Sequence, residues 1–142
     1  MPEVQGPQNP FHPDVKMTRK NISAGSKWEP IIGYSRAVRV GNHVSVSGTA
    51  GVSANGTLEG DTYQQSVRSL QIIEGALKEA GASFKDVVRT RIYLKNAEDW
   101  ELAAKAHGAI FSEIRPATTL VVVKALIDPA MLVEIEVDAI VS

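Results

Sequence analysis

The alternation near the C-terminus restricts the possible folds more than any other feature of this chain. In the stretch "LVEIEVDAIV", apolar and acidic residues take turns. The apolar set is Val133, Ile135, Val137, Ala139 and Val141, and the acidic set is Glu134, Glu136 and Asp138. Because residues two apart share a face of a strand, one face of this predicted strand is apolar and the other carries carboxylates. Its sheet therefore needs a covering layer on one face only.

Two helices are predicted to supply that layer. Between Thr62 and Ala80, apolar residues recur at spacings of three and four, and Gly81 follows as a suitable end of the helix. The second helix follows Asn96, a candidate N-cap. Its predicted apolar stripe is Trp100, Ala103, Ala104, His107, Ile110 and Phe111.

Further strands surround these helices. "SRAVRV" and "HVSVSG" flank Gly41-Asn42, a strong signal for a hairpin. "DVVRTRIYLK" predicts a strand with Val88, Thr90, Ile92 and Leu94 inward, "TTLVVVKA" predicts another, and residues 19–22 are a possible extra strand. The order of strands and helices predicts an α+β fold, a single sheet with two helices on one face. Residues 1–16, rich in proline, are predicted to be a flexible arm, and residues 17–142 a single domain.

The second face of this sheet would be charged. It would carry Arg89, Arg91, Tyr93, Glu134, Glu136 and Asp138. Such a face is either solvated or covered in a closed symmetric assembly, and for an open sheet in a chain of 142 residues we favour assembly.

Composition excludes several classes of function. The net charge of −1 disfavours nucleic acid and anionic membrane surfaces as partners. The absence of cysteine excludes disulfides, thiolate metal sites and cysteine nucleophiles. No apolar run approaches the roughly 20 residues of a membrane span, and no signal peptide is evident, so the cytoplasm is the expected location. His12, His43 and His107 lack metal-ligand spacing, and no glycine-rich phosphate loop occurs, so no metal or cofactor is expected.

Two groups of polar residues could carry chemistry. Glu134 and Glu136 would lie about 7 Å apart on one face of a strand, where a carboxylate could position water or act as a general base. Alternatively, they form cross-strand ion pairs with Arg89 and Arg91. Tyr34 and Ser47 lie around the hairpin, where loop residues can line a site. A triad of Ser47, His43 and Asp138 has only its residue types in its favour.

Several segments together resemble the Rid family of reactive-intermediate deaminases. They are "GYSRAVRVGNHVSVSGTAG", "ALKEAGASFKDVVRTRIYLKNAEDW", "RPATTLVVVKAL" and "LVEIEVDAI", which span about residues 22–141. The resemblance implies a chorismate-mutase-like fold that trimerises through the open sheet face, with sites between subunits. It also implies hydrolysis of an enamine or imine to a 2-keto acid and ammonia without a cofactor.

The resemblance also implies roles for individual residues. Glu134 matches the water-positioning glutamate, and Tyr34, Ser47 and Gly48 match residues of the cleft. Thr118 stands where the deaminases carry the arginine that binds the substrate carboxylate. Replacing a charge-assisted pair by a hydroxyl costs about 2–4 kcal/mol, so the standard mechanism does not transfer directly.

Another arginine could replace this anchor. Arg36 and Arg91 are the candidates, unless both form structural ion pairs. The resemblance therefore predicts a homotrimeric relative of the 2-iminobutanoate/2-iminopropanoate deaminases that lacks the arginine for the substrate carboxylate. It predicts that this relative binds a small, anionic ligand. The alternative is a trimer that binds metabolites or regulates another enzyme without catalysis. A ribonuclease, an activity attached to some relatives, is disfavoured by the charge.

Overall fold

The computed structural model describes residues 18–142, in which six strands form one mixed sheet; the predicted arm at 1–16 lies outside the described residues. The strands are β1 (Arg19–Ile22), β2 (Ala37–Val40), β3 (His43–Thr49), β4 (Val87–Leu94), β5 (Ala117–Val122) and β6 (Val133–Ile140). Their spatial order is β1-β2-β3-β6-β4-β5, and only the β4–β5 pair is parallel. The predicted hairpin and the extra strand at 19–22 are both present.

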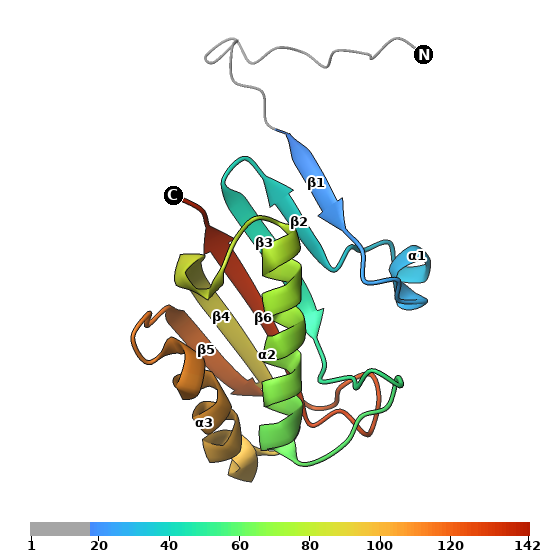
Figure 1. Ribbon diagram of the computed structural model, residues 1–142. Helices are drawn as coiled ribbons and strands as arrows, with labels where there is room; N and C mark the ends of the chain where they lie inside the picture. Colours follow the sequence, from blue (N-terminus) through green and yellow to red (C-terminus); the bar gives the residue numbers. More distant parts are fainter. Residues whose placement is uncertain (1–17) are drawn as a thin grey trace.

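Two long helices cover one face of this sheet (Figure 1). They are α2 (Thr62–Glu79) and α3 (Trp100–Phe111). The chain also has a short helix, α1 (Trp28–Ile32), before β2, and two 3-10 turns, η1 (Phe84–Asp86) and η2 (Ala97–Asp99), between α2 and α3. A capping box starts α2, because the Asp61 carboxylate accepts the N–H of Gln64 while the Gln64 side chain accepts the N–H of Asp61, each at 2.9 Å. The predicted α+β fold with helices on one face is confirmed.

The core lies between the helices and β6. Four apolar residues of β6 are buried, and the α2 residues Leu70, Ile73 and Leu77 pack in the same cluster. The acidic residues of β6 lie on the opposite face, as the alternation predicted. Within residues 18–142, no helix combines the length and the apolar character needed to span a membrane.

One inward residue of β4 was predicted incorrectly. Val88 is 44% exposed, whereas Val87 is buried. The pairing of β4 with β6 shifts register between Val87 and Arg89, and this irregularity reverses the faces of the strand's first residues.

The start of α3 also differs from the expectation. Asn96 precedes η2 and makes no side-chain capping bond, and α3 itself begins at Trp100. Trp100 is 52% exposed, so it is not part of the buried stripe, in which Ala106 takes part instead. The rest of the predicted stripe faces the core, because Ala103 and Phe111 are buried and Ile110 packs against them.

Candidate functional site

A β-bulge at the end of β3 builds the most distinctive polar region of the chain. Val46 pairs with Val137 and Thr49 with Ile135, so β3 has one more residue than β6 across this interval. Bulges redirect side chains and are common next to functional sites. Here the bulge contains Ser47 and Gly48.

Ser47 ties the bulge to the segment that precedes β2. Its hydroxyl donates to the carbonyl of Ser35 at 2.6 Å, and its N–H donates to the carbonyl of Arg36 at 3.0 Å. Ser47 therefore fixes the position of the backbone that carries Arg36, and its hydroxyl hydrogen is already used.

The carboxyl group of Glu134 lies directly against Gly48. A Cβ atom added to Gly48 would stand 3.0 Å from both Cδ and Oε1 of Glu134, so a larger residue would push this carboxyl group aside by a few tenths of an ångström. No hydrogen bond from residues 18–142 reaches the Glu134 carboxyl group. Burial raises the pKa of Glu134; Arg36 opposes this rise, and Glu136 adds to it. A desolvated carboxyl group in a glycine-lined position is a candidate for proton transfer.

Arg36 reaches the same glycine from the other side. Its Nη2 donates to the carbonyl of Gly48 at 2.5 Å, and its guanidinium carbon lies 5.8 Å from the centre of the Tyr34 ring. Its Nε atom is buried and has no hydrogen-bond partner among the described residues. Burial lowers the pKa of Arg36, while Tyr34, Glu134 and Glu29 counteract this effect.

A turn after α1 delivers Tyr34 and Arg36 to the bulge. The buried carboxylate of Glu29 accepts the N–H groups of Ser26 at 2.8 Å and Ala24 at 3.3 Å, and its carbonyl accepts the N–H of Tyr34 at 3.1 Å. Burial would raise the pKa of Glu29, but these hydrogen bonds outweigh it and lower the pKa overall. Glu29 is thus a structural carboxylate that stays ionised.

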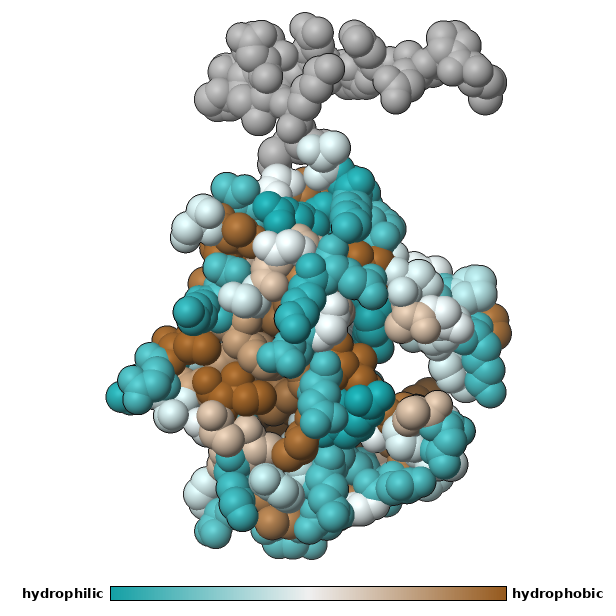
Figure 2. Space-filling model, in the orientation of Figure 1, coloured by the Kyte–Doolittle hydropathy of each residue, from teal (hydrophilic) through white to brown (hydrophobic). Residues whose placement is uncertain are grey.

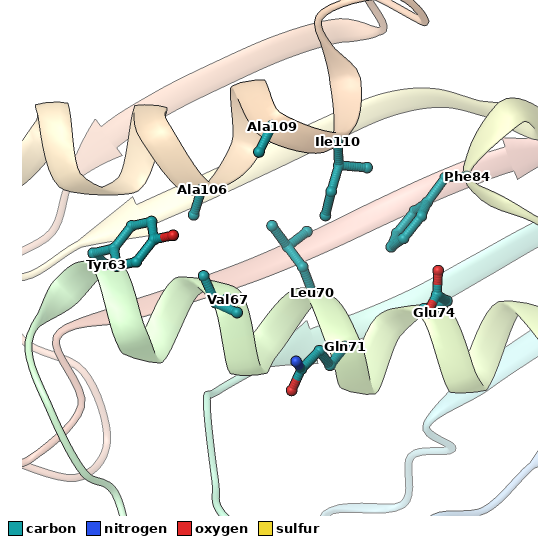
Figure 3. Close-up of a pocket in the computed structure, with 9 residues that line it drawn as sticks. All are labelled: Tyr63, Val67, Leu70, Gln71, Glu74, Phe84, Ala106, Ala109 and Ile110. Carbon is teal, nitrogen blue, oxygen red and sulfur yellow. The ribbon is translucent and has the colours of Figure 1, made fainter.

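The surface is hollowed beside this region. Figure 2 shows a notch between α1 and the loops at 50–61 and 123–132, and β3 ends toward it (Figure 1). A second hollow, an apolar groove of about 500 Å³, lies between α2 and α3 on the helix layer. Its walls include Val67 and Leu70 of α2 and Ile110 of α3, which point toward one another in Figure 3. This groove lies across the sheet from Glu134 and is not part of the candidate site.

Thr118 does not join this group within one chain. Its hydroxyl lies 2.8 Å from that of Thr90 and donates to the carbonyl of Pro116 at 3.1 Å, while Thr90 is also 2.9 Å from Nε2 of His107. Thr90 is fully buried under the helices, so Thr118 points to the helix side of the sheet, away from Glu134. Its predicted role in a ligand site would need a neighbouring subunit and stays a prediction.

Arg91 is likewise engaged elsewhere. Its Nη1 lies 3.2 Å from Asp138 on the open sheet face, where Asp138 also accepts the hydroxyl of Ser45 at 2.8 Å. The Ser45 hydroxyl is in turn 2.9 Å from Nε2 of His43. The triad of Ser47, His43 and Asp138 is therefore wrong, because the Ser47 hydroxyl donates to Ser35 instead. Ser45, which the sequence did not single out, lies between His43 and Asp138.

The remaining charged residues of the open face form cross-strand contacts. Tyr93 donates to Glu136, and this hydrogen bond, together with burial, raises the pKa of Tyr93. Arg89 donates to the hydroxyl of Thr119 at 2.9 Å. Within residues 18–142, no cluster of histidine and carboxylate side chains could hold a metal ion.

Comparison with known proteins matches almost the whole described chain. A protein-family model described as endoribonuclease L-PSP matches residues 24–141. The crystal structure of Rv2704 from Mycobacterium tuberculosis, a member of the YjgF/YER057c/UK114 family, is 46% identical with a TM-score of 0.81, and the match covers 87% of this chain and 100% of that chain. This likeness confirms the predicted chorismate-mutase-like fold.

Relatives known by sequence agree. SCO2049 of Streptomyces coelicolor is 36% identical over 121 residues, which cover 84% of this chain and 90% of the relative. The 3-aminoacrylate deaminase RutC of Acinetobacter baylyi is 33% identical over 108 residues, which cover 75% and 85% of the two chains. The chain therefore belongs to the YjgF/YER057c/UK114 family, the Rid family that its sequence resembles.

Proposed function

We propose that this protein hydrolyses a small imine, enamine or related C–N compound at the site formed by Glu134 and Gly48. The observation that carries the proposal is the Glu134 carboxyl group, which lies against Gly48, has a raised pKa and accepts no hydrogen bond from the described residues. Once ionised, such a carboxylate is a stronger base than an ordinary one and can deprotonate a positioned water.

The proposed reaction needs only water and this carboxyl group. The imine reacts in its protonated form, the iminium ion. Water adds its oxygen to the iminium carbon while Glu134 accepts one proton of the water, which gives a neutral carbinolamine. Glu134 then returns this proton to the nitrogen, and the C–N bond breaks as the hydroxyl group loses its proton to the departing ammonia. The products are a carbonyl compound and an ammonium ion, and Glu134 is ionised again. An enamine enters the same sequence after protonation at carbon.

Relatives and the open sheet face support this proposal. The RutC relative is named as a deaminase of 3-aminoacrylate, a small enamine that carries a carboxylate. We further propose that the chain assembles as a homotrimer through the face that carries Arg91, Tyr93 and Asp138, so that a neighbouring subunit completes the cleft. Thr118 would then enter the site from that neighbour.

Turnover of enzymatically generated 2-aminoacrylate and 2-aminocrotonate tests the reaction. We expect ammonia release by the wild-type protein and a loss of about a hundredfold or more in Glu134→Gln, because the amide cannot accept the proton of the water. The melting temperature and oligomeric state of the variant serve as controls. Equal turnover by the wild type and a folded Glu134→Gln would rule out the proposed role of Glu134.

A second function is a trimer that binds a metabolite without converting it. It is favoured by Thr118, whose neutral hydroxyl is already bonded to Thr90 and Pro116 and supplies no cation. A binder would be stabilised by its ligand according to mass action and would release no ammonia. Under this alternative, Thr118→Arg gains deaminase activity that the wild type lacks.

A further inference from the structure

Arg36 and Glu134 lie on either side of Gly48 without forming an ion pair. Both contact this glycine, one at its carbonyl and the other at its Cα side. Yet no ion pair within 4.0 Å joins them among residues 18–142. Opposite charges that are partly removed from water usually pair, but these two groups instead keep polar atoms without a partner among the described residues.

The guanidinium group of Arg36 has donors to spare. Only Nη2 donates to the protein, and Nε is the guanidinium atom that is buried without a partner. Nη1 makes no hydrogen bond to the described residues and is not among the buried atoms, so it remains open to an incoming group. A planar guanidinium with open donors suits a carboxylate.

We propose that Arg36 anchors the carboxylate of a small ligand whose nitrogen-bearing carbon faces Glu134, replacing the cation that position 118 lacks. The inference rests on the proposed function and specifies its substrate class. The substrates would be short imino or enamino acids whose nitrogen is attached to carbon 2 or carbon 3, counted from the carboxylate. Arg36 and Glu134 contact the same residue, Gly48, so a small molecule beside this glycine can meet both groups. The carboxylate of the ligand, at Arg36, and the hydrolytic water, at Glu134, would then bind to the same subunit.

The other cations of the sheet are less suitable. Arg91 is paired with Asp138 at 3.2 Å on the open face. Arg89 donates to Thr119 near the edge of the sheet.

The carboxylates near Arg36 also leave its guanidinium group free for a ligand. Glu29 accepts the N–H groups of Ser26 and Ala24 and forms no ion pair with Arg36 within 4.0 Å.

Binding of a charged and a neutral probe tests the anchor. We would titrate the full chain with 2-oxobutanoate and with its methyl ester, monitored by NMR. The variants are Arg36→Gln, Arg36→Lys, Arg91→Gln as the rival anchor and Arg19→Gln as an exposed control. We expect the wild type to prefer the anion by about ten- to a hundredfold, the difference made by one charge-assisted pair.

Each variant has a defined expectation. Arg36→Gln loses the preference, and Arg36→Lys, which keeps the charge without the planar fork, weakens anion binding by about three- to tenfold. Arg19→Gln retains the preference, and so does Arg91→Gln where light scattering shows that its assembly matches that of the wild type. If Arg36→Gln does not fold, Arg36→Lys decides. The proposal is overturned by unchanged anion affinity in Arg36→Lys, by loss of preference in an Arg91→Gln of unchanged assembly, or by a wild type without preference or binding.

This result is independent of turnover. Anion preference that depends on Arg36, without ammonia release, leaves the anchor in place and removes the proposed reaction. Turnover that depends on Glu134, without anion preference, keeps the reaction and removes the anchor.

Discussion

Gly48 joins the two charged groups of the candidate site. Its carbonyl holds Arg36 at 2.5 Å, and its missing side chain makes room for the Glu134 carboxyl group. The glycine is therefore required by close approach and not by backbone conformation, since its φ is not positive. Any side chain at this position would move one of the two groups relative to the other.

Replacing Gly48 by alanine is expected to reduce turnover by about threefold to tenfold, because the Glu134 carboxyl group shifts by a few tenths of an ångström and a shift of about 1 Å would cost about a hundredfold. The new Cβ would lie 3.0 Å from Glu134 Cδ, so the carboxyl group must shift. Steady-state kinetics on 2-aminocrotonate measures the effect. Gly75→Ala is the matched control, because a Cβ at Gly75 meets nothing within 4 Å. Full activity of Gly48→Ala would contradict the proposed position of Glu134.

The raised pKa of Glu134 predicts that stability depends on pH at this residue. Burial is the main cause, and the folded pKa of Glu134 lies above the ordinary value of 4.5. The folded state then holds the proton more tightly than the unfolded chain, so this contribution to stability is present below pH 4.5 and lost as pH rises through the folded pKa.

Glu134→Gln removes the ionised, partly buried carboxylate. We expect the variant to be more stable than wild type at neutral pH by about 0.5 kcal/mol after screening by solvent, and this gain to shrink toward pH 4. Denaturant unfolding at several pH values measures it. A variant that is destabilised at neutral pH would show that Glu134 makes a net stabilising contact with Arg36.

Alternation predicts the strands correctly where their pairing is regular. It assigned the two faces of β6 because the pairing of that strand with β4 is regular from Glu134 to Asp138. It failed at Val88 and could not reveal the bulge at Ser47, since "VSVSGT" reads as an ordinary strand. Bulges depend on the partner strand, which a single segment does not specify.

The same limit applies to the site. Residue types and the family resemblance together identified Glu134, Arg36 and Tyr34 as candidates, but only the fold separates Arg36, beside Glu134, from Arg91, beside Asp138. The hydrogen-bonded series from His107 through Thr90 to Thr118 was not predicted, because it joins α3, β4 and β5.

This series predicts a stability effect across three elements. Thr90→Val keeps the shape of the fully buried side chain but leaves His107 and the hydroxyl of Thr118 without this partner. We expect a loss of about 1–2 kcal/mol in the free energy of unfolding. Thr119→Val is the matched control on the exposed neighbour, with an expected change within about 0.5 kcal/mol. Equal losses in the two variants would mean that the buried series has no special weight.

The whole molecule presents two faces of different character. The helix layer buries the apolar side of the sheet, whereas the open face carries Arg91, Tyr93, Glu136 and Asp138 in cross-strand contacts. A polar face of this kind does not require a partner in order to be stable in water. If it assembles, its charges must therefore be complementary across the interface, and specificity will depend on them more than on apolar area.

Arg91→Glu tests this assembly. The substitution removes the pair with Asp138 and places a carboxylate beside Asp138 and Glu136, so like charges would repel within and across the face. We expect light scattering at micromolar concentration to give a trimer for wild type and a smaller species for Arg91→Glu, with helix content unchanged. Arg19→Glu, on the exposed edge strand β1, is the control and should remain trimeric. A monomeric wild type would remove the neighbouring subunit from the proposed cleft, and Thr118 with it, whereas Arg36, Gly48 and Glu134 would still lie together in one chain.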